Sequence, residues 1–194
     1  VVAGGAIWAL EWLEQNNWLD LALPATKEAQ HYGEDHEAAE PLWADMSQVA
    51  PWLTEEVAQQ VTMGSFLAAL SAFYGSIAML EMLSAREHVD LRTRFDKYGH
   101  ILHLAALGRQ PASIVWLMEN GYDDLLKLPT AGGKVTPLHT AIAAKDTFGV
   151  QYLLEKGGAA AETADTLKWV DLALRSANKT IQSFALDHLA KKAM

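Results

Sequence analysis

The sequence predicts an all-α protein built from stacked helical hairpins. Strand signals are few, because alternating runs of β-branched residues are almost absent from the 194 residues. Apolar residues instead recur at intervals of three and four, as they do on the buried face of a helix. Two similar segments also recur at a fixed distance, which is typical of a repeat architecture.

The repeat is clearest in two pairs of landmarks. The segments HILHLAA and TPLHTAI are each followed by an apolar helix that ends in glycine. His103 lies 36 residues before His139, and Gly121 lies 36 residues before Gly157. Because the two separations agree, we interpret the segments as copies of one unit.

In its TPLHTA segment, Thr136–Ala141, the chain resembles the ankyrin repeat family, whose most specific motif it carries unaltered. Thr136 and Pro137 are suited to begin a helix, since a threonine hydroxyl can cap it and the first position needs no amide hydrogen. The resemblance implies that His139 bonds backbone across neighbouring repeats. Gly157 suits the left-handed residue that ends a helix.

The earlier of the two copies departs from the motif. It has His100 and Ile101 in place of the threonine–proline pair, and we expect Pro111 to lie in an enlarged turn between its helices. The connection from Gly121 to Thr136 is also about three residues longer than the family pattern needs. The resemblance implies a β-hairpin finger in this connection, enlarged by the additional residues.

Weaker copies flank these two. One, around Ala69, places a break at Gly75 and divides the uncharged segment Val57–Leu80 into two short helices instead of one membrane span. Another ends polar at Lys191 and Lys192, as expected of a terminal cap. The resemblance therefore implies an ankyrin-like solenoid of about four helical hairpins with extended fingers.

Charge divides the chain in two. Residues 1–60 hold 11 acidic residues and one basic residue, a net charge of −10, whereas residues 61–194 carry +1. We expect an acidic, tryptophan-rich helical region at 1–61 and an ankyrin-like repeat domain at 62–194. The acidity of the first part and the lack of a dense basic patch in the second disfavour nucleic-acid binding.

The absence of cysteine excludes disulfides, thiol catalysis and cysteine-ligated metals, and it fits a reducing cytosol. Val1–Leu10 is apolar but lacks the basic flank and the cleavage pattern of a signal peptide. We therefore expect a cytoplasmic protein without a membrane span, and a monomer outside its complex.

One cluster has the residue types of a metal site. On a helix His36 and Glu40 would share a face, as would His31 and Asp35, but Gly33 interrupts any such helix. A solvated acidic connector is favoured over a divalent-metal site, and a metalloenzyme is a further alternative. The motif histidines are interpreted as structural, so we expect no catalysis, no cofactor and no bound metal.

The resemblance implies a module or scaffold that recognises a protein partner through its fingers and concave face. An alternative is an acidic inhibitor or immunity protein that neutralises a basic enzyme or toxin through residues 1–60, with fast and salt-sensitive docking. The partner contacts expected from position in the repeat are Arg92, Arg94, Tyr98, Leu107, Tyr122, Asp124, Lys127 and Val135.

Five of the seven tryptophans precede residue 61. We expect them to hold the acidic helices on the first repeat, and the alternative is an exposed aromatic hot spot for a partner. They are Trp8, Trp12, Trp18, Trp43 and Trp52.

Overall fold

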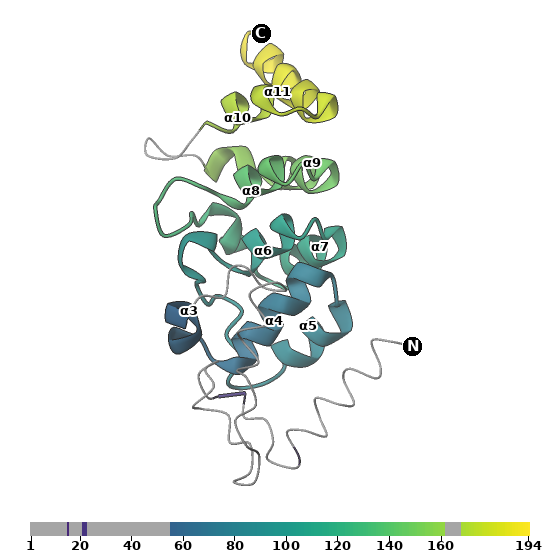
Figure 1. Ribbon diagram of the computed structural model, residues 1–194. Helices are drawn as coiled ribbons and strands as arrows, with labels where there is room; N and C mark the ends of the chain where they lie inside the picture. The colour runs from purple at the N-terminus through teal and green to yellow at the C-terminus, as the bar shows by residue number, and fades with distance from the viewer. Residues whose placement is uncertain (1–14, 16–20, 23–54, 162–167) are drawn as a thin grey trace. The chain divides into compact units, whose positions relative to one another are not determined.

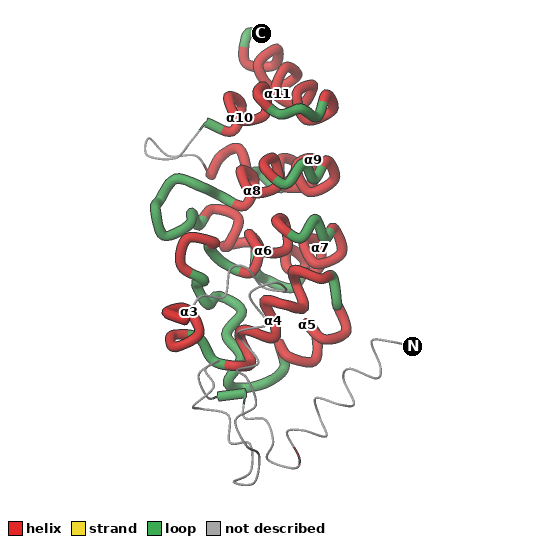
Figure 2. Tube along the Cα trace, in the orientation of Figure 1, coloured by secondary structure: helices red, strands yellow, loops and turns green. Residues whose placement is uncertain are grey.

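The computed structural model describes residues 15, 21–22, 55–161 and 168–194 (Figure 1). Throughout these residues the chain consists of helices and connecting loops without a β-strand, so the predicted all-α class is confirmed (Figure 2). Within the same residues, no helix has the length and apolar character needed to cross a membrane. The metal-type cluster and the five N-terminal tryptophans lie outside the described residues.

The chain divides into two compact units. The first comprises residues 1–71 and 76–95, and the second comprises residues 72–75 and 96–194. The predicted domain boundary after residue 61 stays a prediction.

The described part of the first unit consists of short helices. Gly75, at φ +79°, separates the second of them from the third, because this left-handed conformation ends a helix readily only at glycine. The break predicted at Gly75 is therefore confirmed, although the uncharged segment Val57–Leu80 includes the end of a third helix before the two that flank this glycine. The helices are α3 (Glu55–Gln60), α4 (Met63–Tyr74, of which residues 72–74 belong to the second unit) and α5 (Ile77–Ser84).

The second unit contains three consecutive helical hairpins. The helix α8 packs against both α6 and α10, while α9 contacts both α7 and α11 (Figure 1). The hairpins are α6 (Ile101–Leu107) with α7 (Pro111–Glu119), α8 (Pro137–Ala143) with α9 (Thr147–Glu155), and α10 (Trp169–Arg175) with α11 (Lys179–Lys192). Short 3-10 helices in the connections are η2 (Asp96–Tyr98), η3 (Asp123–Lys127) and η4 (Gly158–Ala161).

Local sequence explains where these helices begin. Pro111 and Pro137 occupy the first helical position, where the missing amide hydrogen costs nothing. At the start of α11 the Oδ1 atom of Asn178 accepts hydrogen bonds from the backbone N–H groups of Thr180 (3.0 Å) and Ile181 (3.3 Å). This side chain satisfies two amides that otherwise have no partner within the helix.

The core of the second unit lies between successive hairpins. Leu104 of α6, Leu138 of α8 and Trp169 of α10 are each at most 1 % exposed. Ala141 is also fully buried, and its small side chain suits close packing between helices. Removing these apolar groups from water is the main source of stability for such an arrangement.

The backbone repeats with the same 36-residue spacing as the sequence. Gly121 and Gly157, which follow α7 and α9, have φ angles of +85° and +92°. Arg109 and Lys145, in the turns inside the two hairpins, have φ angles of +56° and +59°. Because non-glycine residues seldom adopt this conformation, its recurrence at equivalent positions shows that the turn geometry belongs to the repeated unit.

Two expected details are wrong. Pro111 does not lie in an enlarged turn: it is the first residue of α7, and three residues separate the helices in both this hairpin and the next. The connection before α8 contains the 3-10 helix η3 and no strand pair. The terminal hairpin ends in the exposed Lys191 and Lys192, and Leu174, Leu186 and Leu189 are exposed as well.

Candidate protein-binding surface

In the first unit, two predicted contact residues lie in the connection that follows α5. Arg92 and Arg94 are exposed, whereas Leu91 and Phe95 are 3 % and 1 % exposed. The backbone N–H of Arg92 donates a hydrogen bond to Oδ1 of Asp90 (2.8 Å). Buried neighbours and this local turn hold the segment that presents both arginines at the surface.

The same connection is attached to the start of α4. The backbone N–H of Asp90 donates to Oγ of the buried Ser65 (3.0 Å). The Thr62 hydroxyl in turn donates to this oxygen (3.0 Å). One hydrogen bond from the backbone of Asp90 to a side chain of α4 therefore attaches the arginine-bearing connection to a helix of its own unit.

The other six predicted residues belong to the second unit. Tyr98 ends η2 and Leu107 ends α6, and both are half-buried. The remaining four lie in residues 121–136, the connection that we call the α7–α8 finger. They are Tyr122, Val135, Asp124 and Lys127, of which the last two are exposed.

The first half of the α7–α8 finger is packed against its own unit. The ring of Tyr122 stacks on Trp116 of α7, with 6.2 Å between centroids and 22° between planes. Leu125 and Leu126 of η3 are 0 % and 3 % exposed. Because these apolar side chains face inward, the charged residues of η3 are held at the surface.

The second half of the finger forms a tight turn. The backbone N–H of Thr130 donates to the carbonyl of Val135 (2.8 Å), and the N–H of Gly133 donates to the carbonyl of Thr130 (2.8 Å). Gly133 has φ +68°, a conformation that glycine adopts without strain. The turn at Gly132-Gly133 therefore closes through backbone hydrogen bonds.

His103 ties the finger to the preceding hairpin. Its ring is completely buried, and Nδ1 accepts a hydrogen bond from the backbone N–H of His100 (3.2 Å). Since Nδ1 is an acceptor, the neutral ring carries its proton on Nε2. Nε2 lies 3.1 Å from the carbonyl of Val135 and donates to it. The structural role expected for this histidine is confirmed, and it joins α6 to the base of the α7–α8 finger.

The second motif histidine makes the same local contact. The backbone N–H of Thr136 donates to Nδ1 of His139 (3.2 Å), and the Thr136 hydroxyl lies 2.7 Å from the same nitrogen. In both hairpins a histidine at the third helical position thus satisfies the amide of the residue before the helix. In the later hairpin the hydroxyl of Thr136 adds a second contact to the same nitrogen.

One surface residue was not selected from the sequence. Leu128, directly after η3, is 38 % exposed beside the charged Lys127. The signal was present in the run LLKLP, where two leucines are buried and the third is left at the surface. Among the residues that the structure describes, no group of three or more histidines and carboxylates could hold a metal ion.

The sequence was compared with protein-family models and with curated proteins. No protein-family model matches the chain, and no curated protein is significantly similar to it. The functional proposal therefore depends on the residues of this chain and their geometry.

Proposed function

We propose that the chain is an ankyrin-like repeat protein, a solenoid that binds another protein without catalysing a reaction. The observation that carries this proposal is the hydrogen bond from His103 to Val135, which fixes the base of the α7–α8 finger on the preceding hairpin. A recognition loop held in one conformation loses little entropy on binding. The TPLHTA motif and the 36-residue spacing support the same assignment.

The proposed contact surface combines an apolar residue with two opposite charges. Asp124, Lys127 and Leu128 are exposed in or directly after η3. Tyr122, the residue before η3, stacks its ring on Trp116. Aromatic and apolar groups within a polar rim are the usual composition of a protein interface. A cytosolic location belongs to the proposal, on the absence of cysteine.

A charge exchange on the finger tests the surface. The partner is first identified by affinity capture from the native cell, and its Kd is then measured by calorimetry. We expect the variant Asp124→Lys with Lys127→Glu to raise Kd at least tenfold, about 1.4 kcal/mol, because complementary charges become repulsive. The matched control, Glu155→Lys with Lys156→Glu, exchanges two exposed charges at the end of α9 and should change Kd less than twofold. Equal effects of the two variants would contradict the proposed surface.

The arginine-bearing connection is tested separately. We expect Arg92→Glu with Arg94→Glu to weaken the same complex at least tenfold, because two exposed positive charges are reversed. Lys145→Glu with Lys156→Glu makes an equal change of net charge elsewhere and serves as the control. Unchanged binding of the arginine variant would remove this connection from the contact surface.

A further inference from the structure

The C-terminal hairpin carries a stripe of exposed leucines. Leu186 and Leu189 of α11 are 56 % and 43 % exposed, and Leu174 at the end of α10 is 38 % exposed. The Nε2 atom of Gln182 donates to the carbonyls of Leu174 (3.2 Å) and Ser176 (2.8 Å), which places the end of α10 beside α11. Since Leu186 lies one turn after Gln182 and Leu189 lies three residues further, the leucines follow one side of the hairpin.

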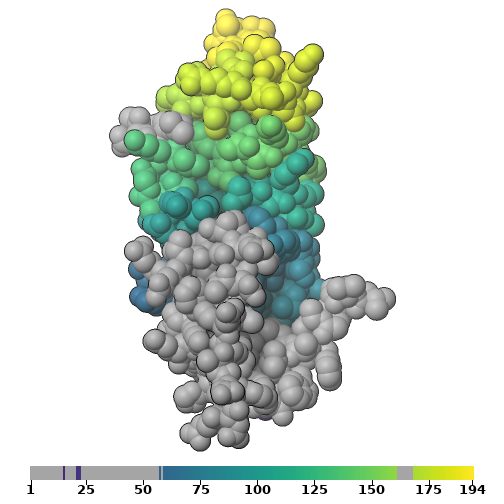
Figure 3. All heavy atoms as spheres, viewed as in Figure 1, coloured from purple at the N-terminus to yellow at the C-terminus, as the bar shows by residue number. Residues whose placement is uncertain are grey.

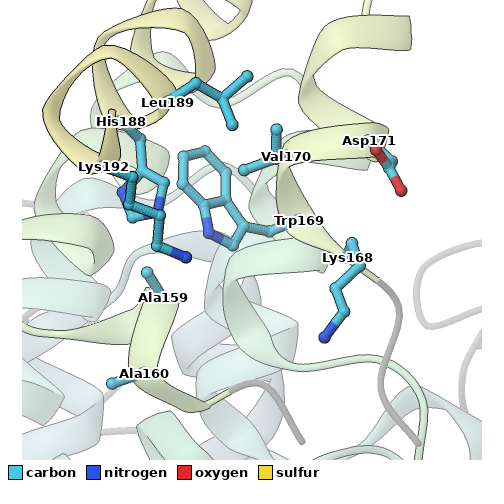
Figure 4. A pocket seen from close by; sticks show the side chains of 9 residues that line it. All are labelled: Ala159, Ala160, Lys168, Trp169, Val170, Asp171, His188, Leu189 and Lys192. Carbon is cyan, nitrogen blue, oxygen red and sulfur yellow. The ribbon is translucent and has the colours of Figure 1, made fainter. Parts of the chain in front are cut away.

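A pocket adjoins this stripe on the same hairpin (Figure 4). The buried indole of Trp169 forms one wall of the pocket. The ring of His188 packs edge-on against it, with 5.0 Å between the ring centroids. Leu189 borders the pocket and also belongs to the stripe, so the two apolar features are continuous. The other lining residues are Ala159, Ala160, Lys168, Val170, Asp171 and Lys192.

The charge around these apolar features is positive. Residues 168–194 contain five basic and two acidic side chains, and all seven are exposed. In Figure 3 the yellow C-terminal hairpin forms one end of the second unit, and no described residue of that unit lies beyond it. The basic residues are Lys168, Arg175, Lys179, Lys191 and Lys192, and the acidic residues are Asp171 and Asp187.

We propose that the hairpin α10–α11 binds residues 1–60 of a second copy of this chain, so that copies associate head to tail. Those 60 residues carry a net charge of −10, which complements the +3 of the hairpin. They also hold five of the seven tryptophans, a residue type that often supplies the central contacts of an interface. Pairing of two C-terminal hairpins would instead place like charges together, which disfavours a symmetric contact. The association is therefore heterologous and differs from the monomer that we expected from the sequence.

The first test is sedimentation of the full-length chain over a range of concentrations. We expect species larger than the monomer at low salt that dissociate in about 1 M salt, where the Debye length is only about 3 Å. A chain that stays monomeric at low salt up to about 100 μM, a hundredfold above a micromolar Kd, would overturn the proposal.

Complementary variants then distinguish the head-to-tail contact from other modes. One variant, Leu186→Ser with Lys191→Glu and Lys192→Glu, alters the hairpin, and the other, Glu34→Lys with Glu37→Lys and Glu40→Lys, alters the acidic segment. We expect each to be monomeric alone, and their equimolar mixture to form a heterodimer that grows no further, because one intact contact remains. A mixture that stays monomeric, or a hairpin variant that still self-associates, contradicts this contact.

Folding and specificity are controlled within the same experiment. Leu128→Ser with Lys145→Glu and Lys156→Glu makes the same types of change at exposed positions outside the hairpin. We expect this control to self-associate like the unaltered chain. Circular dichroism and urea unfolding of each variant verify that it is folded, and the intact second contact in the mixture provides a positive readout that a misfolded variant could not give.

Discussion

Replacement of His103 by alanine is expected to lower the free energy of unfolding by about 3 kcal/mol. The change leaves the buried N–H of His100 without its acceptor, which costs about 1–3 kcal/mol. It also removes the bond to the carbonyl of Val135 and opens a cavity at a completely buried position. Urea unfolding followed by circular dichroism measures the difference.

Two conservative variants separate the contributions of the two ring nitrogens. In His103→Asn the amide oxygen can replace Nδ1 as the acceptor for His100, but nothing reaches Val135. In His103→Gln the amide nitrogen can replace Nε2 as the donor to Val135, but the N–H of His100 loses its acceptor. We expect each variant to lower the free energy of unfolding by about 1–2 kcal/mol, less than His103→Ala does, because one of the two hydrogen bonds is retained.

The control for these variants is a histidine at the surface. His88 is exposed, and His88→Ala should change stability by less than about 0.5 kcal/mol. If His103→Ala has as small an effect as His88→Ala, the ring does not join the hairpin to the finger.

The bond from His103 also links stability to the proposed function. The carbonyl of Val135 accepts from both Nε2 of His103 and the N–H of Thr130, so the histidine supports the closure of the α7–α8 finger. We expect the amide of Thr130 to exchange its hydrogen faster in His103→Asn than in His103→Gln, since only the latter retains the bond to Val135. A looser finger must be ordered on binding, which reduces affinity without changing a contact residue.

Much of the second unit could be predicted from sequence because its signals are local and repeated. The proline at the start of α8 and the glycines that follow α7 and α9 each act within a few residues, and the two glycines recur at the 36-residue spacing. The structural role of His103 could be predicted because a histidine, His139, recurs at the equivalent position of the later copy. In the candidate contact surface, the sequence predicted the long connection between α7 and α8. It predicted neither the 3-10 helix η3 in that connection nor the exposure of Leu128.

The turn before Pro111 shows why other details could not be predicted. A left-handed residue in a turn is normally signalled by glycine or asparagine, but Arg109 and Lys145 occupy it here. Without that signal the sequence predicts Pro111 inside the turn, whereas this proline is the first residue of α7. The exposed leucines of α11 had no signal of their own either, because the same apolar spacing fits a buried face until the neighbours of the helix are known.

The close contact at Gly108, directly after α6, could not be predicted from the sequence either. We expect Gly108→Ala to lower the free energy of unfolding by about 3 kcal/mol. A Cβ atom there would collide with the carbonyl oxygen of Phe73 and lie 2.9 Å from its carbonyl carbon. These are backbone atoms of the second unit, so no side-chain rotation can relieve the overlap, and either helix end must move. Thermal and urea unfolding measure the loss.

Two matched substitutions show whether the collision is the cause. Gly132→Ala has nothing within 4 Å of the new Cβ and should change stability by less than about 0.5 kcal/mol. Ala144, which lies 36 residues after Gly108 and occupies the same position after α8, already carries a Cβ, so the repeated unit does not itself require glycine there. Ala144→Gly should cost about 0.5–1 kcal/mol, as expected for added backbone freedom alone. If Gly108→Ala is as stable as the unaltered chain, residues 72–75 do not approach the end of α6 in solution, and the collision with the Phe73 backbone does not occur.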